Sequence, residues 1–114
     1  MSNPRTKNPS TNFTFACKLS ELKPNVPLSL EVNDRFVVLA ILDGTVFCIE
    51  DNCTHDGGTL GGGELLGNCL VCPRHGAKFD IRTGDAICMP ATEGTLSHEV
   101  EIRGEEVFVQ LKDN

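Results

Sequence analysis

No run of apolar residues in the sequence approaches the roughly 20 that a membrane-spanning helix needs. The first residues, MSNPRTKNPSTN, contain neither the apolar centre of a secretory signal nor a twin arginine. We therefore expect a cytoplasmic protein that does not enter a membrane. Because residues 1–12 are rich in Asn, Ser, Thr and Pro, we expect a disordered leader ahead of a single domain over residues 13–114.

Basic residues are scarce relative to acidic ones. Lys and Arg number 10 against 16 Asp and Glu, which gives a formal net charge of −6. A surface of this sign repels phosphate backbones and anionic headgroups, which argues against nucleic acid or a membrane as a partner. An acidic surface suits docking to a basic protein, although it also serves solubility.

Most of the chain alternates apolar and polar residues, the pattern of half-buried strands. The only helical candidate is a single turn at residues 20–22. Asn33-Asp34, Asp43-Gly44 and Arg103-Gly104 mark turns between strands. Strands are therefore expected near residues 13–17, 28–32, 36–42, 46–49, 99–103 and 107–111.

For two of these strands, the sequence also predicts which residues are buried. Phe13, Phe15 and Cys17 share one parity, so we expect them on the buried face of the first strand. Residues 36–42 are apolar at every position, which predicts a central strand buried on both faces. The chain is therefore expected to be an all-β frame that carries an insert at about residues 51–90.

The insert contains most of the glycine, and only very short strands are expected in it, at residues 68–71, 77–81 and 85–87. A glycine-rich segment of this length cannot bury a sufficient core of its own. A bound metal centre would supply the missing stabilisation.

Two mixed pairs of metal-binding side chains lie in the insert: Cys53 with His55, and Cys72 with His75. Sixteen residues, 56–71, separate the pairs. In an extended loop, residues two apart point the same way, and a three-residue spacing suits a tight turn. Because thiolates and imidazoles bind zinc and iron–sulfur centres, we expect these four side chains to share one metal site.

The mixed pairs bear on which metal binds. A zinc site with two Cys and two His usually takes both Cys from one loop and both His from the other, so zinc is possible but less suited. A two-iron cluster takes both thiolates on one iron and both imidazoles on the other, which is the Rieske arrangement. Glycines would let backbone N–H groups approach the bridging sulfides. The glycines concerned are Gly57, Gly58, Gly61, Gly62, Gly63 and Gly67.

At these residues the sequence resembles the Rieske [2Fe–2S] proteins. The matching motifs are C-T-H-D-G-G at 53–58, C-P-R-H-G-A-K-F-D at 72–80, T-G at 83–84 and M-P-A at 89–91. The resemblance implies an antiparallel β-sandwich with an inserted, loop-rich cluster-binding subdomain and one Rieske-type [2Fe–2S] cluster.

The resemblance also assigns roles to residues. It implies that Cys53 and Cys72 bind the inner iron and that His55 and His75 bind the outer iron. The segment around Pro90 would cover the cluster as a third loop.

The sequence departs from the respiratory and photosynthetic members of the family. Gly58 and Arg74 stand where those members have a pair of disulfide-forming cysteines, and Ala77 stands where they have a serine. The chain also has no Tyr to donate a hydroxyl to the cluster. Fewer hydrogen bonds to cluster sulfur lower the reduction potential, so we expect a value toward the low end of the roughly −150 to +300 mV Rieske range.

The chain resembles the soluble Rieske-type ferredoxins of bacterial ring-hydroxylating oxygenases. Only His98 remains once His55 and His75 are used, too few for a mononuclear iron site, and no nucleotide-binding glycine fingerprint is present. The resemblance therefore implies a monomeric electron carrier between a reductase and a terminal oxygenase, and not an enzyme. Alternatives are a small subunit or accessory of nitrite reductase or of an iron–sulfur assembly system.

A few reactive residues have a simpler interpretation. His98 shares the parity of the apolar residues after it, so we expect it to be partly buried and hydrogen-bonded. Arg74 and Lys78 flank His75, where they would border a docking surface, tune the cluster or be solvated. The remaining cysteines are expected to be small buried apolar residues: Cys17, Cys48, Cys69 and Cys88.

Overall fold

The structure is a computed structural model that describes residues 13–52, 60, 63–73, 76–88 and 93–112 of the chain, and the side chain of Cys88 lies outside this description. The predicted leader, residues 1–12, is also outside it. In the described part no helix is long and apolar enough to cross a bilayer. The elements are β1 (Thr14–Lys18), the 3₁₀ turn η3 (Leu19–Glu21), β2 (Leu28–Val32), β3 (Arg35–Leu42), β4 (Thr45–Glu50), β5 (Leu65–Leu66), β6 (Cys69–Val71), β7 (Lys78–Asp80), β8 (Ala86–Cys88), β9 (Ser97–Arg103) and β10 (Glu106–Gln110).

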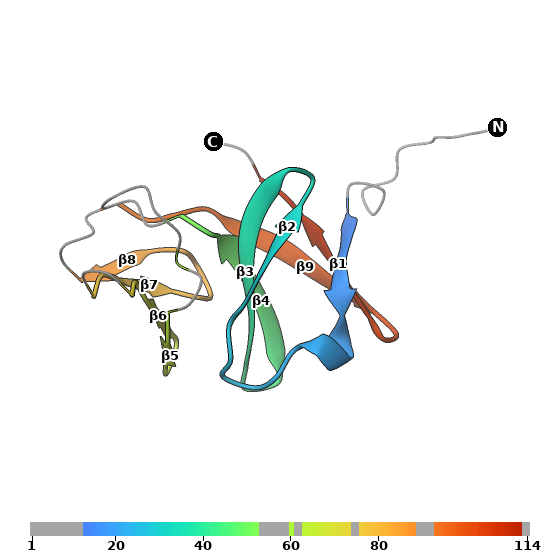
Figure 1. Cartoon of the computed structure of the whole chain (residues 1–114), viewed down its shortest axis with the longest axis horizontal. Coiled ribbons are helices and arrows are strands. Elements are labelled where there is room, and N and C mark those ends of the chain that lie inside the picture. The colour runs from blue at the N-terminus through green and yellow to red at the C-terminus, as the bar shows by residue number, and fades with distance from the viewer. Residues whose placement is uncertain (1–12, 53–59, 61–62, 74–75, 89–92, 113–114) are drawn as a thin grey trace.

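The strands form two antiparallel sheets (Figure 1). One has six strands in the order β1-β10-β9-β4-β3-β2, and the other has four in the order β5-β6-β7-β8. Asn33 Nδ2 donates a hydrogen bond to Thr14 Oγ1 at 3.0 Å, so the two outer strands of the larger sheet meet and the sheet folds over itself. The prediction of an all-β, antiparallel fold is confirmed, and the expected single turn near residue 20 is η3.

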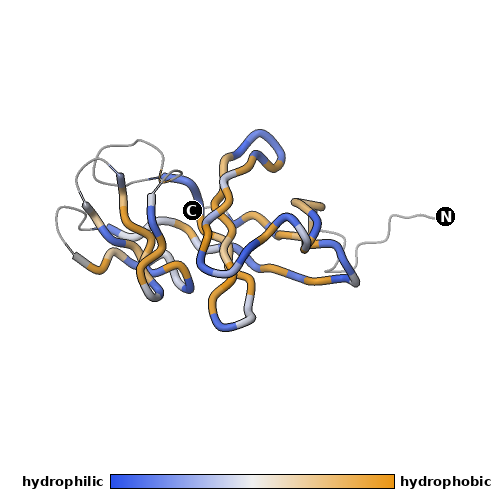
Figure 2. Tube along the Cα trace, turned by 60° about the horizontal axis from the view of Figure 1, so that its bottom comes forward, coloured by the Kyte–Doolittle hydropathy of each residue, from blue (hydrophilic) through white to orange (hydrophobic). Residues whose placement is uncertain are grey.

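The folded-over sheet encloses a buried group of side chains that we call the frame core. Apolar residues follow the strands and polar residues gather at the connecting turns (Figure 2), as alternation in the sequence predicts. The frame core consists of Cys17, Leu22, Val32, Val37, Leu39, Cys48, Val107 and Val109.

The predicted turns have the backbone that their sequences require. Asn33 and Asp34 both have positive φ, 51° and 66°, and so do Asp43 and Gly44, at 53° and 80°. Two successive positive-φ residues between paired strands are the mark of a type I′ hairpin, which Asn, Asp and Gly tolerate. Local sequence therefore determines the β2–β3 and β3–β4 connections.

Strand β3 is buried on both faces, as predicted. Val37 and Leu39 belong to the frame core, whereas Val38 and Ala40 pack on the opposite side, and all four are fully buried. Phe36, at the start of the same apolar run, is 55% exposed. Most of β3 thus separates the frame core from a second buried group on the opposite face of the strand.

The prediction for Phe15 is wrong. Phe15 is 47% exposed while Cys17 is buried, although both share one parity. The register between β1 and β10 shifts between these two residues, so a β-bulge turns Phe15 to the outer face. There its ring packs edge-on against Phe108, with centroids 5.8 Å apart.

The smaller sheet packs against the outer face of β3 and β4 through a second buried group, which we call the insert core. Strands β6, β7 and β8 lie at the three very short strands expected of the insert, and in addition β5 pairs with β6. The insert core consists of Val38, Ala40, Ile49, Leu60, Leu65, Leu70, Cys72, Ala77, Phe79 and Ile81.

Two insert glycines are required by the fold itself. A Cβ on Gly63 would lie 1.9 Å from the carbonyl oxygen of Val71, so only glycine permits this close approach. Gly67 has φ 60° in the turn between β5 and β6. The expected approach of their N–H groups to bridging sulfides stays a prediction, and the other four glycines of that prediction lie outside the described residues.

Candidate metal centre

Cys72 is the predicted ligand that the structure describes. It follows β6, is 1% exposed and belongs to the insert core. Its N–H donates to the carbonyl oxygen of Ala77 at 2.7 Å, and Gly76 N–H donates to the Cys72 carbonyl oxygen at 3.1 Å. Gly76 has φ 79°, a conformation that favours glycine. These bonds close a short turn from residue 72 to residue 77 and fix the sulfur donor at its base.

The other three predicted ligands, Cys53, His55 and His75, lie outside the described residues, as do Arg74 and Pro90. Among the residues that are described, no group of three or more His, Cys, Asp or Glu side chains could hold a metal ion. The structure therefore does not bring the four predicted ligands together or separate them.

The described residues on either side of the first pair nevertheless connect to the core that contains Cys72. Asp51 Oδ1 accepts a hydrogen bond from Leu60 N–H at 2.5 Å, which joins the two ends of the segment that contains Cys53 and His55. Leu60 is fully buried in the same insert core as Cys72. A thiolate held beside an apolar core at the base of a turn fits the inner, sulfur-bound iron of a Rieske cluster.

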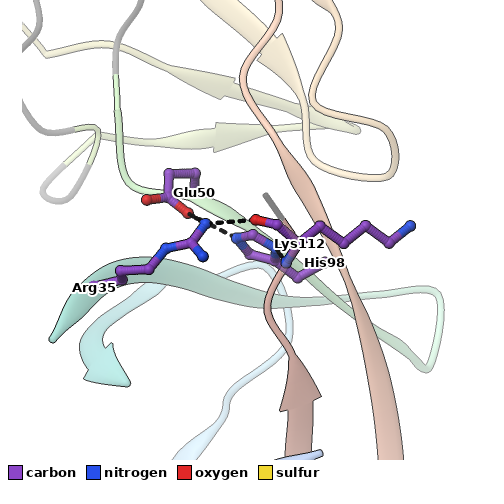
Figure 3. Close-up of polar contacts among 4 residues, drawn as sticks. All are labelled: Arg35, Glu50, His98 and Lys112. Carbon is purple, nitrogen blue, oxygen red and sulfur yellow. Dashed lines mark hydrogen bonds and ion pairs between the residues drawn. The ribbon is translucent and has the colours of Figure 1, made fainter. Parts of the chain in front are cut away.

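A polar network stabilises the frame where the insert begins (Figure 3). Arg35 Nη2 donates to Glu50 Oε1 at 2.9 Å and to the Lys112 carbonyl oxygen at 2.7 Å. His98 Nε2 contacts the same Glu50 oxygen at 2.8 Å, and Lys112 N–H donates to His98 Nδ1 at 3.0 Å. The network links β3, β4, β9 and the segment after β10, next to the start of the first ligand segment.

His98 is buried and hydrogen-bonded, as predicted, and its side chain has no exposed surface. Because Nδ1 accepts the Lys112 N–H, the ring proton lies on Nε2 and is donated to Glu50. Burial lowers the pKa of His98, Glu50 acts in the opposite direction, and the charges of Arg35 and Lys112 lower it further. His98 is therefore neutral at pH 7.

This lowered pKa predicts a pH dependence of stability. The unfolded chain takes up a proton on His98 near pH 6.5 and the folded chain only at lower pH, so stability is complete above about pH 6.5 and falls below it. The slope from this group is at most about 1.4 kcal/mol per pH unit. Denaturant unfolding of the wild type and of His98→Gln between pH 5 and 7.5 measures it. The difference in unfolding free energy should shrink as the pH falls, and a pH-independent difference would contradict the prediction.

Sequence inspection missed the acidic clamp in the insert. Asp80 is 7% exposed and accepts hydrogen bonds from Asn68 Nδ2 at 3.0 Å and from Arg82 N, Nε and Nη2 at 2.8, 3.0 and 2.8 Å. The Arg82 guanidinium lowers the pKa of the Asp80 carboxyl. The sequence did contain a signal for this clamp: the oppositely charged Asp80 and Arg82 lie two residues apart, just before Thr83-Gly84. The clamp fixes the β7–β8 turn.

The other cysteines are mostly as expected. Cys17 and Cys48 are buried in the frame core, and neither forms a disulfide. Burial raises the pKa of both thiols. Cys69 also lacks a disulfide but is only partly buried, because it lies in the narrow sheet of the insert, so its prediction is only partly correct.

Known proteins share both the sequence pattern and the fold. The Rieske [2Fe-2S] domain family matches residues 12–109. The 3-phenylpropionate/cinnamic acid dioxygenase ferredoxin subunit of Shigella boydii serotype 4 is 28% identical over 103 residues, which cover 90% of this chain and 96% of that protein. The ferredoxin of carbazole 1,9a-dioxygenase from Nocardioides aromaticivorans IC177 superposes with a TM-score of 0.83 at 27% identity, over 88% of this chain and 98% of that one.

A further solved structure is a complex of reduced oxygenase and oxidized ferredoxin in carbazole 1,9a-dioxygenase. Its matching chain has a TM-score of 0.79 at 28% identity, with 86% of this chain and 92% of that chain covered. The family match spans most of the residues, and the two ferredoxin structures share the fold of this chain. The chain belongs to the Rieske [2Fe–2S] domain family and binds one Rieske-type cluster.

Proposed function

We propose that this chain is an electron carrier that accepts single electrons from a reductase and delivers them to a terminal oxygenase. The observation that carries the proposal is the extent of the matches: the dioxygenase ferredoxin subunit is covered over 96% of its length and the carbazole dioxygenase ferredoxin over 98%. The similarity is thus to complete ferredoxins. Their names associate them with oxygenases, and the solved complex pairs one such ferredoxin with its oxygenase.

In this proposal Cys53 and Cys72 bind the inner iron and His55 and His75 bind the outer one. The bound cluster supplies a one-electron redox centre. The chain's part is to hold the thiolates beside the insert core and to exclude water from them, a role that the burial of Cys72 supports. Imidazoles at the other iron leave that side of the centre open to a partner.

A transfer assay tests the function. The purified protein is reduced with dithionite and mixed with the oxidised oxygenase component of carbazole 1,9a-dioxygenase. We expect cluster reoxidation in the stopped-flow trace, and product when a reductase, NADH and carbazole are added. Reoxidation no faster than in oxygenase-free buffer, across several ring-hydroxylating oxygenases, would contradict the proposal. Stable co-purification with a nitrite reductase would replace it.

The proposal includes a low reduction potential, below about +100 mV within the Rieske range. Ala77 is fully buried and has no hydroxyl to donate to a cluster sulfur. Ala77→Ser adds a donor that stabilises the reduced, more negative cluster. One hydrogen bond of about 1 kcal/mol raises the potential by roughly 40 mV.

Redox titration of the wild type and Ala77→Ser checks this prediction. Ala86→Ser is the matched control, because Ala86 is partly buried against the same insert core. A wild-type value above about +100 mV, or equal shifts in both variants, would contradict the assignment.

The proposed carrier acts in the cytoplasm as a monomer. Among the described residues, the thiols of Cys17, Cys48 and Cys69 form no disulfide, which supports a reducing compartment. Lys78, which is partly exposed on β7, and Arg74 would border the docking surface on the histidine side.

A further inference from the structure

We propose that Asp51 is a positioning residue that holds the two ends of the first ligand segment, Asn52 and Leu60, together before the cluster binds. The inference rests on the proposed function, since it takes Cys53 and His55 as ligands. Asp51 itself binds no iron in this proposal. Its carboxylate fixes the ends of the segment so that a thiolate and an imidazole are presented together.

The contacts of Leu60 anchor the far end of the ligand segment. Asp51 Oδ1 accepts the N–H of Leu60 at 2.5 Å, across nine positions of the chain. The side chain of Leu60 is fully buried in the insert core, and its carbonyl oxygen accepts the N–H of Gly63 at 3.1 Å. The far end of the ligand segment is therefore anchored to the core that contains Cys72.

The contacts on the frame side orient the carboxylate. Asp51 N–H donates to the carbonyl oxygen of Phe36 on β3 at 2.9 Å, and Ser29 Oγ on β2 donates to Asp51 Oδ2 at 3.4 Å. The preceding residue, Glu50, is held in the network of Figure 3. Asp51 thus connects the frame to the end of the ligand segment.

The chemistry of an aspartate suits this task. An ionised carboxylate only accepts hydrogen bonds, and here an N–H and a hydroxyl both point at it. Without the bond, the two ends of the segment would have to be brought together as the cluster binds, with a loss of chain entropy. A hydrogen bond to a charged group changes an equilibrium by about 10- to 100-fold, so that is the expected effect on cluster retention.

Cluster-loaded wild type and variants are compared in three measurements: iron and labile sulfide per chain, the half-life of visible absorbance with an excess of an iron chelator, and the midpoint of thermal unfolding. Asp51→Ala is expected to lose its cluster about 10- to 100-fold faster than the wild type. Asp51→Asn keeps an acceptor oxygen and should lose it only a few-fold faster, so it also decides the matter if Asp51→Ala does not fold. Ser29→Ala should stay close to the wild type.

Asp80→Ala is the matched control, because Asp80 is a buried carboxylate of the same insert that contacts Asn68 and Arg82. Its cluster loss should accelerate only as far as its unfolding temperature falls, whereas Asp51→Ala should lose cluster well before it unfolds. Wild-type retention in Asp51→Ala, or cluster loss that follows unfolding as in Asp80→Ala, would overturn the inference. Loss in Asp51→Asn as fast as in Asp51→Ala would overturn it too.

Cys53→Ser separates this inference from the proposed function. It should yield protein without a cluster in the same assay. If Cys53→Ser retains a full complement of iron and sulfide, the ligand assignment has failed, whatever Asp51 does.

Discussion

Replacing Cys72 by serine is expected to abolish the cluster, with iron and sulfide reduced to background and no electron transfer. A serine hydroxyl stays protonated where a thiol is deprotonated by the metal, and it is a poor ligand for iron in a sulfide cluster. Cys72 is 1% exposed in the insert core, so the new hydroxyl also enters an apolar site. A buried polar group without a suitable partner costs about 1 to 3 kcal/mol.

Metal and sulfide analysis, visible absorption and the EPR spectrum of the reduced protein measure this result. Cys69→Ser is the control, because Cys69 lies three residues earlier on β6, is only partly buried and has no proposed ligand role. The control should keep its cluster and the spectrum of the wild type. A Cys72→Ser protein with a full cluster would remove Cys72 from the ligand set, and zinc without sulfide in the wild type would contradict the Rieske site.

The sequence predicts the frame well because its signals are local. Asn33-Asp34 and Asp43-Gly44 specify type I′ hairpins by themselves, and the apolar run of β3 indicates burial on both faces. The exposed Phe15 was not predictable in this way. Its orientation depends on a bulge against β10, which is set by the pairing of residues about 90 positions apart.

The insert is harder to predict because its contacts are tertiary. Strand β5 has two residues, too few for a periodic pattern, and the need for glycine at position 63 arises only when the Val71 carbonyl comes close. The hydrogen bond from Leu60 N–H to Asp51 has no local signal in the sequence either. The metal site is easier to predict than these contacts, because two mixed Cys/His pairs indicate metal chemistry from the sequence alone.

Gly84→Ala is expected to destabilise the folded protein strongly. Gly84 has φ 83°, and a Cβ there would lie 2.2 Å from the carbonyl oxygen of Thr95. Positive φ costs a residue with a Cβ about 1 to 2 kcal/mol, and overpacking adds about 1 to 3 kcal/mol. The expected loss is therefore about 2 to 5 kcal/mol, a large part of the roughly 5 to 15 kcal/mol of a typical domain.

The matched control for this prediction is Gly44→Ala. Gly44 has nearly the same φ, 80°, but a Cβ there would meet nothing within 4 Å, so this variant isolates the backbone cost of about 1 to 2 kcal/mol. Urea unfolding of both variants gives the difference, and equal losses would contradict a steric role for Thr95. Gly84 carbonyl oxygen also accepts Thr95 N–H at 2.7 Å, which joins the ends of the segment that includes Pro90. If that segment covers the cluster, Gly84→Ala should also shorten cluster retention, whereas Gly44→Ala, in the β3–β4 turn, should leave it unchanged.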